Sequence, residues 1–96
     1  MAEWRSEELL ATHFHRHGRR LRCATIEQYD ASARETIEVG IQFEYRDPDS
    51  GAWRMGWYDR LSQRFTATNE DGVLMLTHFR CPERYVADTL PGSTYS

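Results

Sequence analysis

The chain has 96 residues, a length that favours one domain with a modest core. A hydrophobic fraction of 40% favours folding over disorder. No apolar run approaches the roughly 20 residues that a membrane span needs, and the acidic N-terminus does not resemble a signal peptide. The formal net charge of −3 gives no overall support for nucleic-acid binding.

Two helices are expected in the first 40 residues. Ser6 precedes two glutamates and is a typical N-cap for a helix that runs to about His17, where Gly18 favours a stop. Thr25 begins a capping box, and apolar residues then recur at helical spacing from about Ile26 to Val39, directly before another glycine.

Beyond residue 40 the apolar period changes to two, which indicates strands. Turns rich in Asp, Asn, Pro and Gly separate the alternating segments. The expected strands cover residues 41–46, 53–58, 63–68 and 73–79. Residues 82–90 are expected to form a short closing helix or an irregular arm, and the tail over residues 91–96 is expected to be loose.

This order of elements predicts an α+β fold, in which two N-terminal helices pack on a four-stranded antiparallel sheet. Residues 1–96 are expected to form a single compact domain, ordered from about residue 5 to about residue 90. Cys23 and Cys81 have no CxxC spacing, so we expect reduced and mostly buried thiols rather than a disulfide or a zinc site.

The basic segment from His13 to Arg22 is the strongest functional signal. It holds three of the four histidines and four of the twelve basic residues, and no acid occurs from Leu9 to Ile26. On a helix, His13 and His17 share one face, whereas His15 lies elsewhere. Histidine exchanges a proton near neutral pH and arginine suits phosphate, so this segment suggests acid–base chemistry on a phosphodiester.

Three interpretations of the histidine pair stay open. In the first, one imidazole takes the proton from an RNA 2′-hydroxyl and the other protonates the leaving 5′-oxygen. In the second, His13 and His17 chelate a metal ion, although the sequence offers neither the glutamate of a zincin motif nor an evident third ligand. In the third, both are polar surface residues that interact favourably with the dipole at the helix end.

Four arginines are candidates for holding phosphate beside the histidines. Arg19 and Arg20 follow the first helix and either grip phosphates or form a solvated loop. Arg54 lies on the strand face opposite two tryptophans, where it either covers the sheet or stabilises charge on a phosphate. Arg80 follows the last strand within reach of the same site.

Thr77 lies near the end of the last predicted strand. Alternation places it on the same face as Val73, Met75 and Phe79, with His78 on the opposite face. Its hydroxyl either bonds a phosphate oxygen or belongs to an ordinary β-branched strand residue. The sequence alone favours the ordinary role.

Several short motifs occur in a fixed order between residues 10 and 82. They are Leu10-x-x-His13-Phe14-x-x-His17-Gly18, Thr25-x-Glu27-x-Tyr29, Asp71-Gly72 and Thr77-x-Phe79-Arg80 before Pro82. Their order resembles small bacterial RNase toxin domains of the barnase, EndoU, colicin and RelE-like (BECR) group, which occur at the C-termini of polymorphic and contact-dependent toxins. Members of this group often have two helices followed by four antiparallel strands.

The resemblance implies a metal-independent endoribonuclease toxin domain that needs no cofactor. It implies that His13 and His17 are the acid–base pair, and that RNA cleavage leaves a 2′,3′-cyclic phosphate. It further implies that Thr77, Arg54 and Arg80 surround the phosphate. The sequence departs from the group's pattern where a cysteine separates the last arginine from its proline.

The resemblance also implies partners and a location. The implied substrate is RNA, with tRNA among the candidates, and the implied protein partner is a cognate immunity protein or antitoxin, with no role for a membrane. The expected place of action is the bacterial cytoplasm, including delivery there from another cell. The alternative function is a non-catalytic binding module on the same α+β frame, either antitoxin-like or regulatory, which the acidic charge and the many aromatic residues fit.

Overall fold

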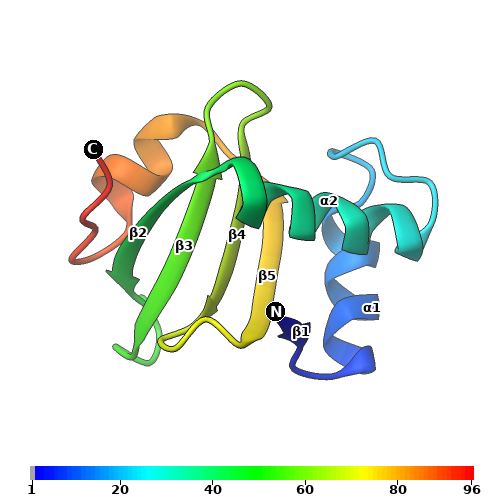
Figure 1. Cartoon of the computed structure of the whole chain (residues 1–96), viewed down its shortest axis with the longest axis horizontal. Helices are drawn as coiled ribbons and strands as arrows, with labels where there is room; N and C mark the ends of the chain where they lie inside the picture. Colours follow the sequence, from blue (N-terminus) through cyan, green and yellow to red (C-terminus); the bar gives the residue numbers. More distant parts are fainter. Residues whose placement is uncertain (1) are drawn as a thin grey trace.

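Figure 1 shows a central β-sheet with helices packed against it and the two chain ends at opposite edges. The computed structural model describes residues 2–96. Its helical segments are α1 (Glu7–His17), α2 (Ile26–Val39) and a short π-helix, η1 (Tyr85–Thr89). Its strands are β1 (Glu3–Trp4), β2 (Ile41–Arg46), β3 (Trp53–Asp59), β4 (Arg64–Asn69) and β5 (Leu74–Arg80), in the spatial order β1-β5-β4-β3-β2. None of the helices in residues 2–96 is long and apolar enough to cross a membrane.

The fold is α+β, and β2 to β5 form an antiparallel meander, but the expectation of four strands is wrong because β1 adds a fifth. β1 pairs in parallel with β5, with Glu3 opposite Leu74 and Trp4 opposite Met75. Trp4 Nε1 also donates a 2.8 Å hydrogen bond to Asp30 on α2. A strand of two residues is too short to show alternation, so only its tertiary contacts reveal it.

Helix α1 begins and ends where the sequence predicts, but Gly18 does not adopt the left-handed conformation expected of a glycine stop. The backbone N–H of Leu9 donates to the Ser6 hydroxyl at 3.0 Å, as expected of an N-cap. Gly18 has an ordinary helical φ of −56°. A side chain is excluded at this position because a Cβ atom would lie 2.7 Å from a ring carbon of Phe14. The residue that reverses the chain in the left-handed conformation is Arg22, with a φ of 57°.

Helix α2 covers one face of the sheet. Its N-cap is Thr25, whose hydroxyl accepts from the Gln28 N–H at 3.1 Å, while the Gln28 side chain accepts from the Ala24 N–H at 2.7 Å. These bonds form the predicted cap, with the return bond shifted by one residue. The α2 residues buried against the sheet are Tyr29, Ala33 and Thr36.

The opposite face of the sheet carries the main apolar cluster. Its buried members come from β2 to β4 and from the chain after β5: Phe43, Tyr45, Tyr58, Phe65, Ala67, Cys81, Val86, Leu90 and Tyr95. Helix α1 reaches this same face at β5. The part of the face between α1 and η1 is left open.

The last six residues pack against β2, contrary to the expected loose tail. The Thr94 N–H donates to the Glu44 carbonyl at 2.9 Å, and the Arg46 N–H donates to the Pro91 carbonyl at 2.7 Å. Tyr95 is only 8% exposed. The tail therefore covers the outer edge of β2, and the expected closing helix is present as η1.

Strand β5 contains a β-bulge that the sequence does not predict. In register with β4, Thr77 lies opposite Ala67 but Met75 lies opposite Thr68, so Leu76 is an extra residue. The expectation that Met75 shares a face with Thr77 is therefore wrong. Met75 lies on the face that α2 covers, and Thr77 lies on the open face.

Candidate active site

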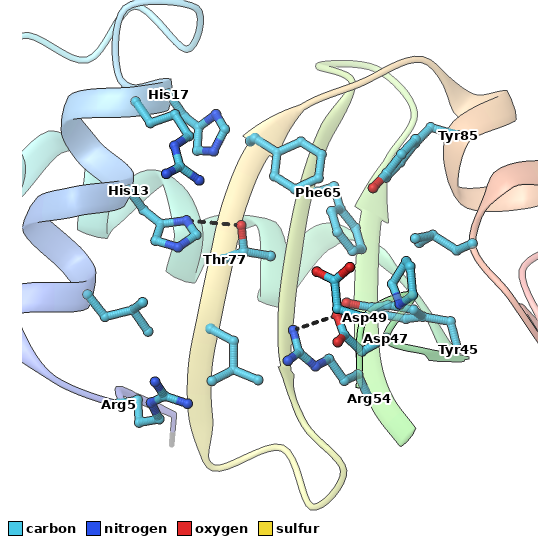
Figure 2. A pocket seen from close by; sticks show the side chains of 16 residues that line it. Arg5, His13, His17, Tyr45, Asp47, Asp49, Arg54, Phe65, Thr77 and Tyr85 are labelled. Carbon is cyan, nitrogen blue, oxygen red and sulfur yellow. Dashed lines mark hydrogen bonds and ion pairs between the residues drawn. The ribbon is translucent and has the colours of Figure 1, made fainter. Parts of the chain in front are cut away.

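A cleft of about 510 Å³ opens on the sheet face between α1 and η1 (Figure 2). Strands β4 and β5 form its floor, α1 forms one wall, and η1 with the turn between β2 and β3 forms the other. This volume lies within the range of about 300–1,000 Å³ that is typical of ligand sites. The charged and polar residues that line it are Arg5, His13, Arg16, His17, Tyr45, Asp47, Asp49, Arg54, Thr77 and Tyr85.

The cleft brings together the two histidines and the threonine that the sequence predicts. His13 Nδ1 lies 3.1 Å from Thr77 Oγ1. The ring centroids of His13 and His17 are 5.7 Å apart, and the His17 ring packs at 5.2 Å on Phe79. Both imidazoles therefore lie on the α1 wall, one helical turn apart, as their spacing indicates.

The hydroxyl of Thr77 suits both protonation states of His13. A neutral imidazole with a bare Nδ1 accepts a hydrogen bond from the hydroxyl, whereas an imidazolium donates one to it. The ring can therefore keep one orientation before and after a proton transfer. The bulge in β5 aids this contact, because it turns both Leu76 and Thr77 toward the cleft.

Both histidines have a lowered affinity for protons in the free protein. Burial and, to a smaller degree, the Arg16 guanidinium lower the pKa of His13 below its ordinary 6.5. Burial, followed by the charges of His13, Arg16 and Arg20, lowers the pKa of His17 to about 4. Both imidazoles are therefore mostly neutral at pH 7 in the empty cleft, and a negative ligand would favour their protonation.

Arg54 lies across the cleft from the histidines and pairs with a carboxylate. Its Nη1 is 3.5 Å from Asp47 Oδ1 (Figure 2). The backbone N–H and the hydroxyl of Ser50 both donate to Asp47 Oδ2, at 2.8 and 2.9 Å. These bonds, aided by Arg54, hold the pKa of Asp47 below its usual range. Because Asp49 lines the same wall, this side of the cleft holds one cation and two carboxylates.

Two arginines that the sequence analysis did not single out as site residues also line the cleft. Arg16 lies on α1 within the acid-free segment, so the charge pattern held a signal for it. Arg5 precedes α1, and its backbone N–H donates to the Met75 carbonyl at 3.2 Å. It reaches the cleft because β1 pairs with β5, which no local pattern indicates.

The other three predicted phosphate contacts lie outside the cleft. Arg80 is on the opposite face of β5, where its Nη2 donates to Gln63 Oε1 at 3.0 Å. Arg20 and Arg80 together line two hollows. Arg19 lines a third hollow, next to His15 and Cys23. The structure therefore does not bring these arginines to the phosphate position beside Thr77.

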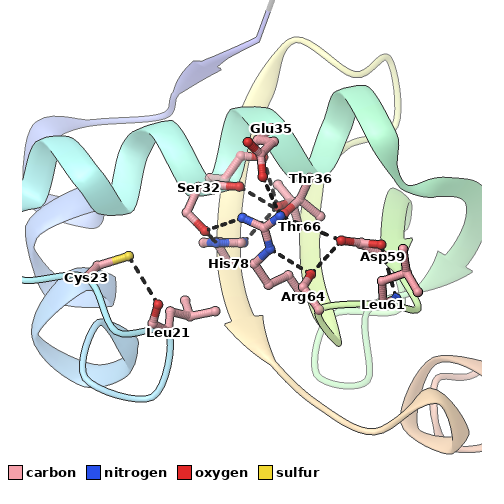
Figure 3. A network of polar contacts seen from close by, with 12 residues as sticks. Leu21, Cys23, Ser32, Glu35, Thr36, Asp59, Leu61, Arg64, Thr66 and His78 are labelled. Carbon is pink, nitrogen blue, oxygen red and sulfur yellow. Dashed lines mark hydrogen bonds and ion pairs between the residues drawn. The ribbon is translucent and has the colours of Figure 1, made fainter.

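The remaining two histidines have no place in the cleft. His15 is exposed on another side of α1. His78 is fully buried beneath α2, where Nδ1 donates to the Phe65 carbonyl at 3.0 Å and the Ser32 hydroxyl donates to Nε2 at 2.9 Å (Figure 3). Burial lowers the pKa of His78 to about 3, so it is a neutral structural residue.

Metal ligation and thiol chemistry find little support in this arrangement. Among residues 2–96, no three His, Cys, Asp or Glu side chains are placed to hold a metal ion. Burial raises the pKa of Cys81 to about 12 and also raises that of Cys23, so both thiols are protonated at neutral pH. Neither cysteine is a ready nucleophile.

Comparison of the chain with protein-family models, with curated proteins and with solved structures finds no match. The geometry of the cleft and the order of the sequence motifs are therefore the grounds for a functional proposal.

Proposed function

We propose that the protein is a metal-independent endoribonuclease domain. One observation carries the proposal: His13 and Thr77, 64 positions apart in sequence, meet within hydrogen-bond distance in a cleft that also holds His17 and three arginines. Two imidazoles on one wall supply a base and an acid, and guanidinium groups supply charge for a phosphate. The resemblance to BECR toxin domains implies the same pair on the first helix.

The proposed reaction uses side chains alone. One neutral imidazole takes the proton from a 2′-hydroxyl of RNA, and the 2′-oxygen attacks the neighbouring phosphorus. The bond between phosphorus and the 5′-oxygen breaks as the other histidine, an imidazolium, protonates that oxygen. The products are a 2′,3′-cyclic phosphate and a 5′-hydroxyl end, and the two histidines have exchanged protonation states.

We assign the base to His17 and the acid to His13. Beyond burial, His17 faces positive charge from His13, Arg16 and Arg20, whereas His13 faces Arg16 alone. His17 therefore holds a proton less readily, and a bound phosphodiester would favour the protonated form of His13. Thr77 would then accept from Nδ1 of the imidazolium, which leaves the Nε2 proton for the leaving group.

The three arginines of the cleft are the proposed phosphate ligands. Arg16 lies on α1 with the two histidines. Arg5 lies on the same side of the cleft as His13, and Arg54 lies opposite (Figure 2). Arg54 is paired with Asp47 in the free protein, so RNA binding exchanges a carboxylate for a phosphate oxygen. Because the guanidinium has an anionic partner before and after this exchange, its charge is never left unpaired.

The biological setting follows from the resemblance and is proposed on that ground. We propose that the domain acts on RNA in the bacterial cytoplasm, with tRNA as one candidate substrate. A cognate immunity protein or antitoxin would be its protein partner. An inhibitor of this kind would be expected to cover the cleft between α1 and η1.

The test is incubation of the purified protein with tRNA and with total RNA in EDTA. We expect cleavage that leaves a 2′,3′-cyclic phosphate, identified by mass spectrometry of the fragments. The double variant His13→Ala/His17→Ala should lose it, and His15→Ala is the matched control because this exposed histidine lies on the same helix outside the cleft. Intact RNA with the wild-type protein, or undiminished cleavage by the double variant, would overturn the proposal.

One observation favours the second candidate, a non-catalytic binding module. Asp47 already occupies Arg54, and Asp49 adds a second negative charge to the same wall, which suits a basic protein segment better than a phosphate. Growth of bacteria expressing the wild-type chain separates the two functions. A nuclease should arrest growth and its histidine double variant should not, whereas a binding module should leave growth unchanged in both cases.

A further inference from the structure

A second group of arginines lies outside the cleft and forms what we name the arginine basin. The basin consists of two hollows of about 320 and 530 Å³ that share Arg20 and Arg80. Gln63 lines the smaller hollow, and Arg22 and Arg64 line the larger one. The proposed chemistry in the cleft uses none of these residues as a phosphate ligand.

Three of the four basin arginines have no acidic partner within residues 2–96. The arginines that form ion pairs in this part of the chain are Arg34, Arg54, Arg60 and Arg64. Arg64 is held between a carboxylate of α2 and another at the end of β3, so its charge is neutralised (Figure 3). Arg20, Arg22 and Arg80 remain as uncompensated cations on a protein whose net charge is negative.

The backbone around the basin adopts conformations that are costly for these residue types. Arg22 and Gln63, with φ angles of 57° and 60°, are the two non-glycine residues of the described chain with positive φ. Left-handed conformations are unfavourable for L-residues with a Cβ, and they persist where the surrounding structure imposes them. Gln63 Oε1 also accepts from Arg80 Nη2 at 3.0 Å, which holds that guanidinium in place. Both strained residues thus line the same basin.

The basin adjoins one end of the cleft. His17 lies at that end (Figure 2), with the ring of Phe79 5.2 Å from its own. Arg80 follows Phe79 directly along β5, and Arg20 lies in the turn that continues α1 beyond His17. The charge of Arg20 reaches His17, because it contributes after burial to the lowered pKa of that imidazole.

We infer that the arginine basin binds the phosphate backbone of the same RNA strand whose scissile phosphodiester lies in the cleft. The inference rests on the proposed nuclease function and extends it, because it makes single-stranded RNA of several nucleotides the preferred substrate class. Guanidinium groups bind phosphate whatever the base, so the basin sets a preference for length and none for sequence. Arg20 and Arg80 are the central ligands, and Arg22 lies at the rim.

The experiment compares Arg20→Ala/Arg80→Ala with the wild-type protein on two substrates. A dinucleotide has one phosphodiester and fills only the cleft, whereas a twelve-nucleotide strand with one cleavable ribonucleotide also reaches the basin. We expect kcat/KM on the longer strand to fall about tenfold or more, and its dependence on salt to weaken by about 0.7 in log–log slope for each phosphate that the variant no longer binds. Losing the Arg20 charge raises the pKa of His17, so each protein is compared at its own pH optimum, where cleavage of the dinucleotide should change by less than about twofold.

Two further variants control for charge and folding. Arg46→Ala/Arg84→Ala removes the same charge from exposed residues that line neither the cleft nor the basin, and it should behave like the wild type. Arg20→Lys/Arg80→Lys keeps the charge and should restore most of the salt dependence. Equal losses on both substrates, or no loss on the longer strand, would overturn the inference.

A binding measurement separates this inference from the nuclease proposal. The fluorescence anisotropy of a labelled twelve-nucleotide strand, in which a deoxynucleotide replaces the cleavable ribonucleotide, reports affinity without catalysis. If the wild-type protein cleaves nothing but Arg20→Ala/Arg80→Ala still weakens binding relative to Arg46→Ala/Arg84→Ala, the nuclease proposal falls and the basin remains as a binding site. If binding is the same in both variants, the basin proposal fails whatever the outcome for cleavage.

Discussion

Removing one histidine at a time distinguishes the acid from the base, because the two roles respond differently to the leaving group. With a pKa of about 4, His17 is protonated in only about one molecule in a thousand at pH 7. As an acid, His17 would therefore begin with a thousandfold deficit, whereas as a base it is ready to react. A ribose 5′-oxygen needs the proton of His13 in order to leave, but 4-nitrophenolate leaves without one.

The assay measures kcat/KM of each single variant on a dinucleotide and on uridine 3′-(4-nitrophenyl phosphate). On the dinucleotide, His13→Ala and His17→Ala should each lose about 10²–10⁴-fold. On the nitrophenyl ester, His13→Ala should stay within about tenfold of the wild type and His17→Ala should keep its full loss. His15→Ala should match the wild type on both substrates. The reverse pattern would exchange the two roles, and equal losses on both substrates would refute the acid–base assignment.

The structure makes three further predictions. The pH profile of kcat/KM should be bell-shaped, with its optimum below pH 6.5. The acid form of His13 is lost as pH rises through its lowered pKa, and the base form of His17 is lost as pH falls through about 4. An optimum above pH 7 in a dinucleotide assay would contradict this. Thr77→Val should lower kcat by about twofold to tenfold by removing the bond to His13 and should alter the pH profile, whereas Thr77→Ser should keep both. His78 should lower the free energy of unfolding by up to about 1.4 kcal/mol per pH unit from pH 6.5 toward pH 3, because its imidazole binds a proton in the unfolded chain but stays neutral in the fold, and His13 and His17 add to this slope for the same reason. Urea unfolding at several pH values measures this slope, which should decrease by up to about 1.4 kcal/mol per pH unit in His78→Gln and stay unchanged in His15→Ala.

Local patterns predicted much of the fold because most elements carry their own signals. Ser6 and Thr25 are N-caps in the structure, since the hydroxyl and the orphan N–H that it satisfies lie within three residues of each other. The meander was predicted because alternation and turn residues occur within each hairpin. Gly18 shows the limit of such rules. Glycine is required there because the Phe14 ring leaves no room for a Cβ atom, and not because the backbone adopts a positive φ.

Features that depend on distant contacts were missed or misplaced. β1 exists because of its pairing with β5, and Arg5 enters the cleft for the same reason. The bulge at Leu76 interrupts simple alternation, so Thr77 reached the predicted side whereas Met75 did not. The resemblance groups Arg80 with Thr77, but β5 continues through Arg80, and residues an odd number apart on a regular strand point to opposite faces.

The ends of the chain have a consequence for solubility. β1 lies along one outer strand of the meander, and the last six residues bond to the backbone of the other at Glu44 and Arg46. An uncovered strand edge is a template for pairing with another molecule. Trimming residues 91–96 would leave the cleft lining untouched. It would expose the edge of β2 and remove Tyr95 from the apolar cluster, and the shortened protein should self-associate through that edge.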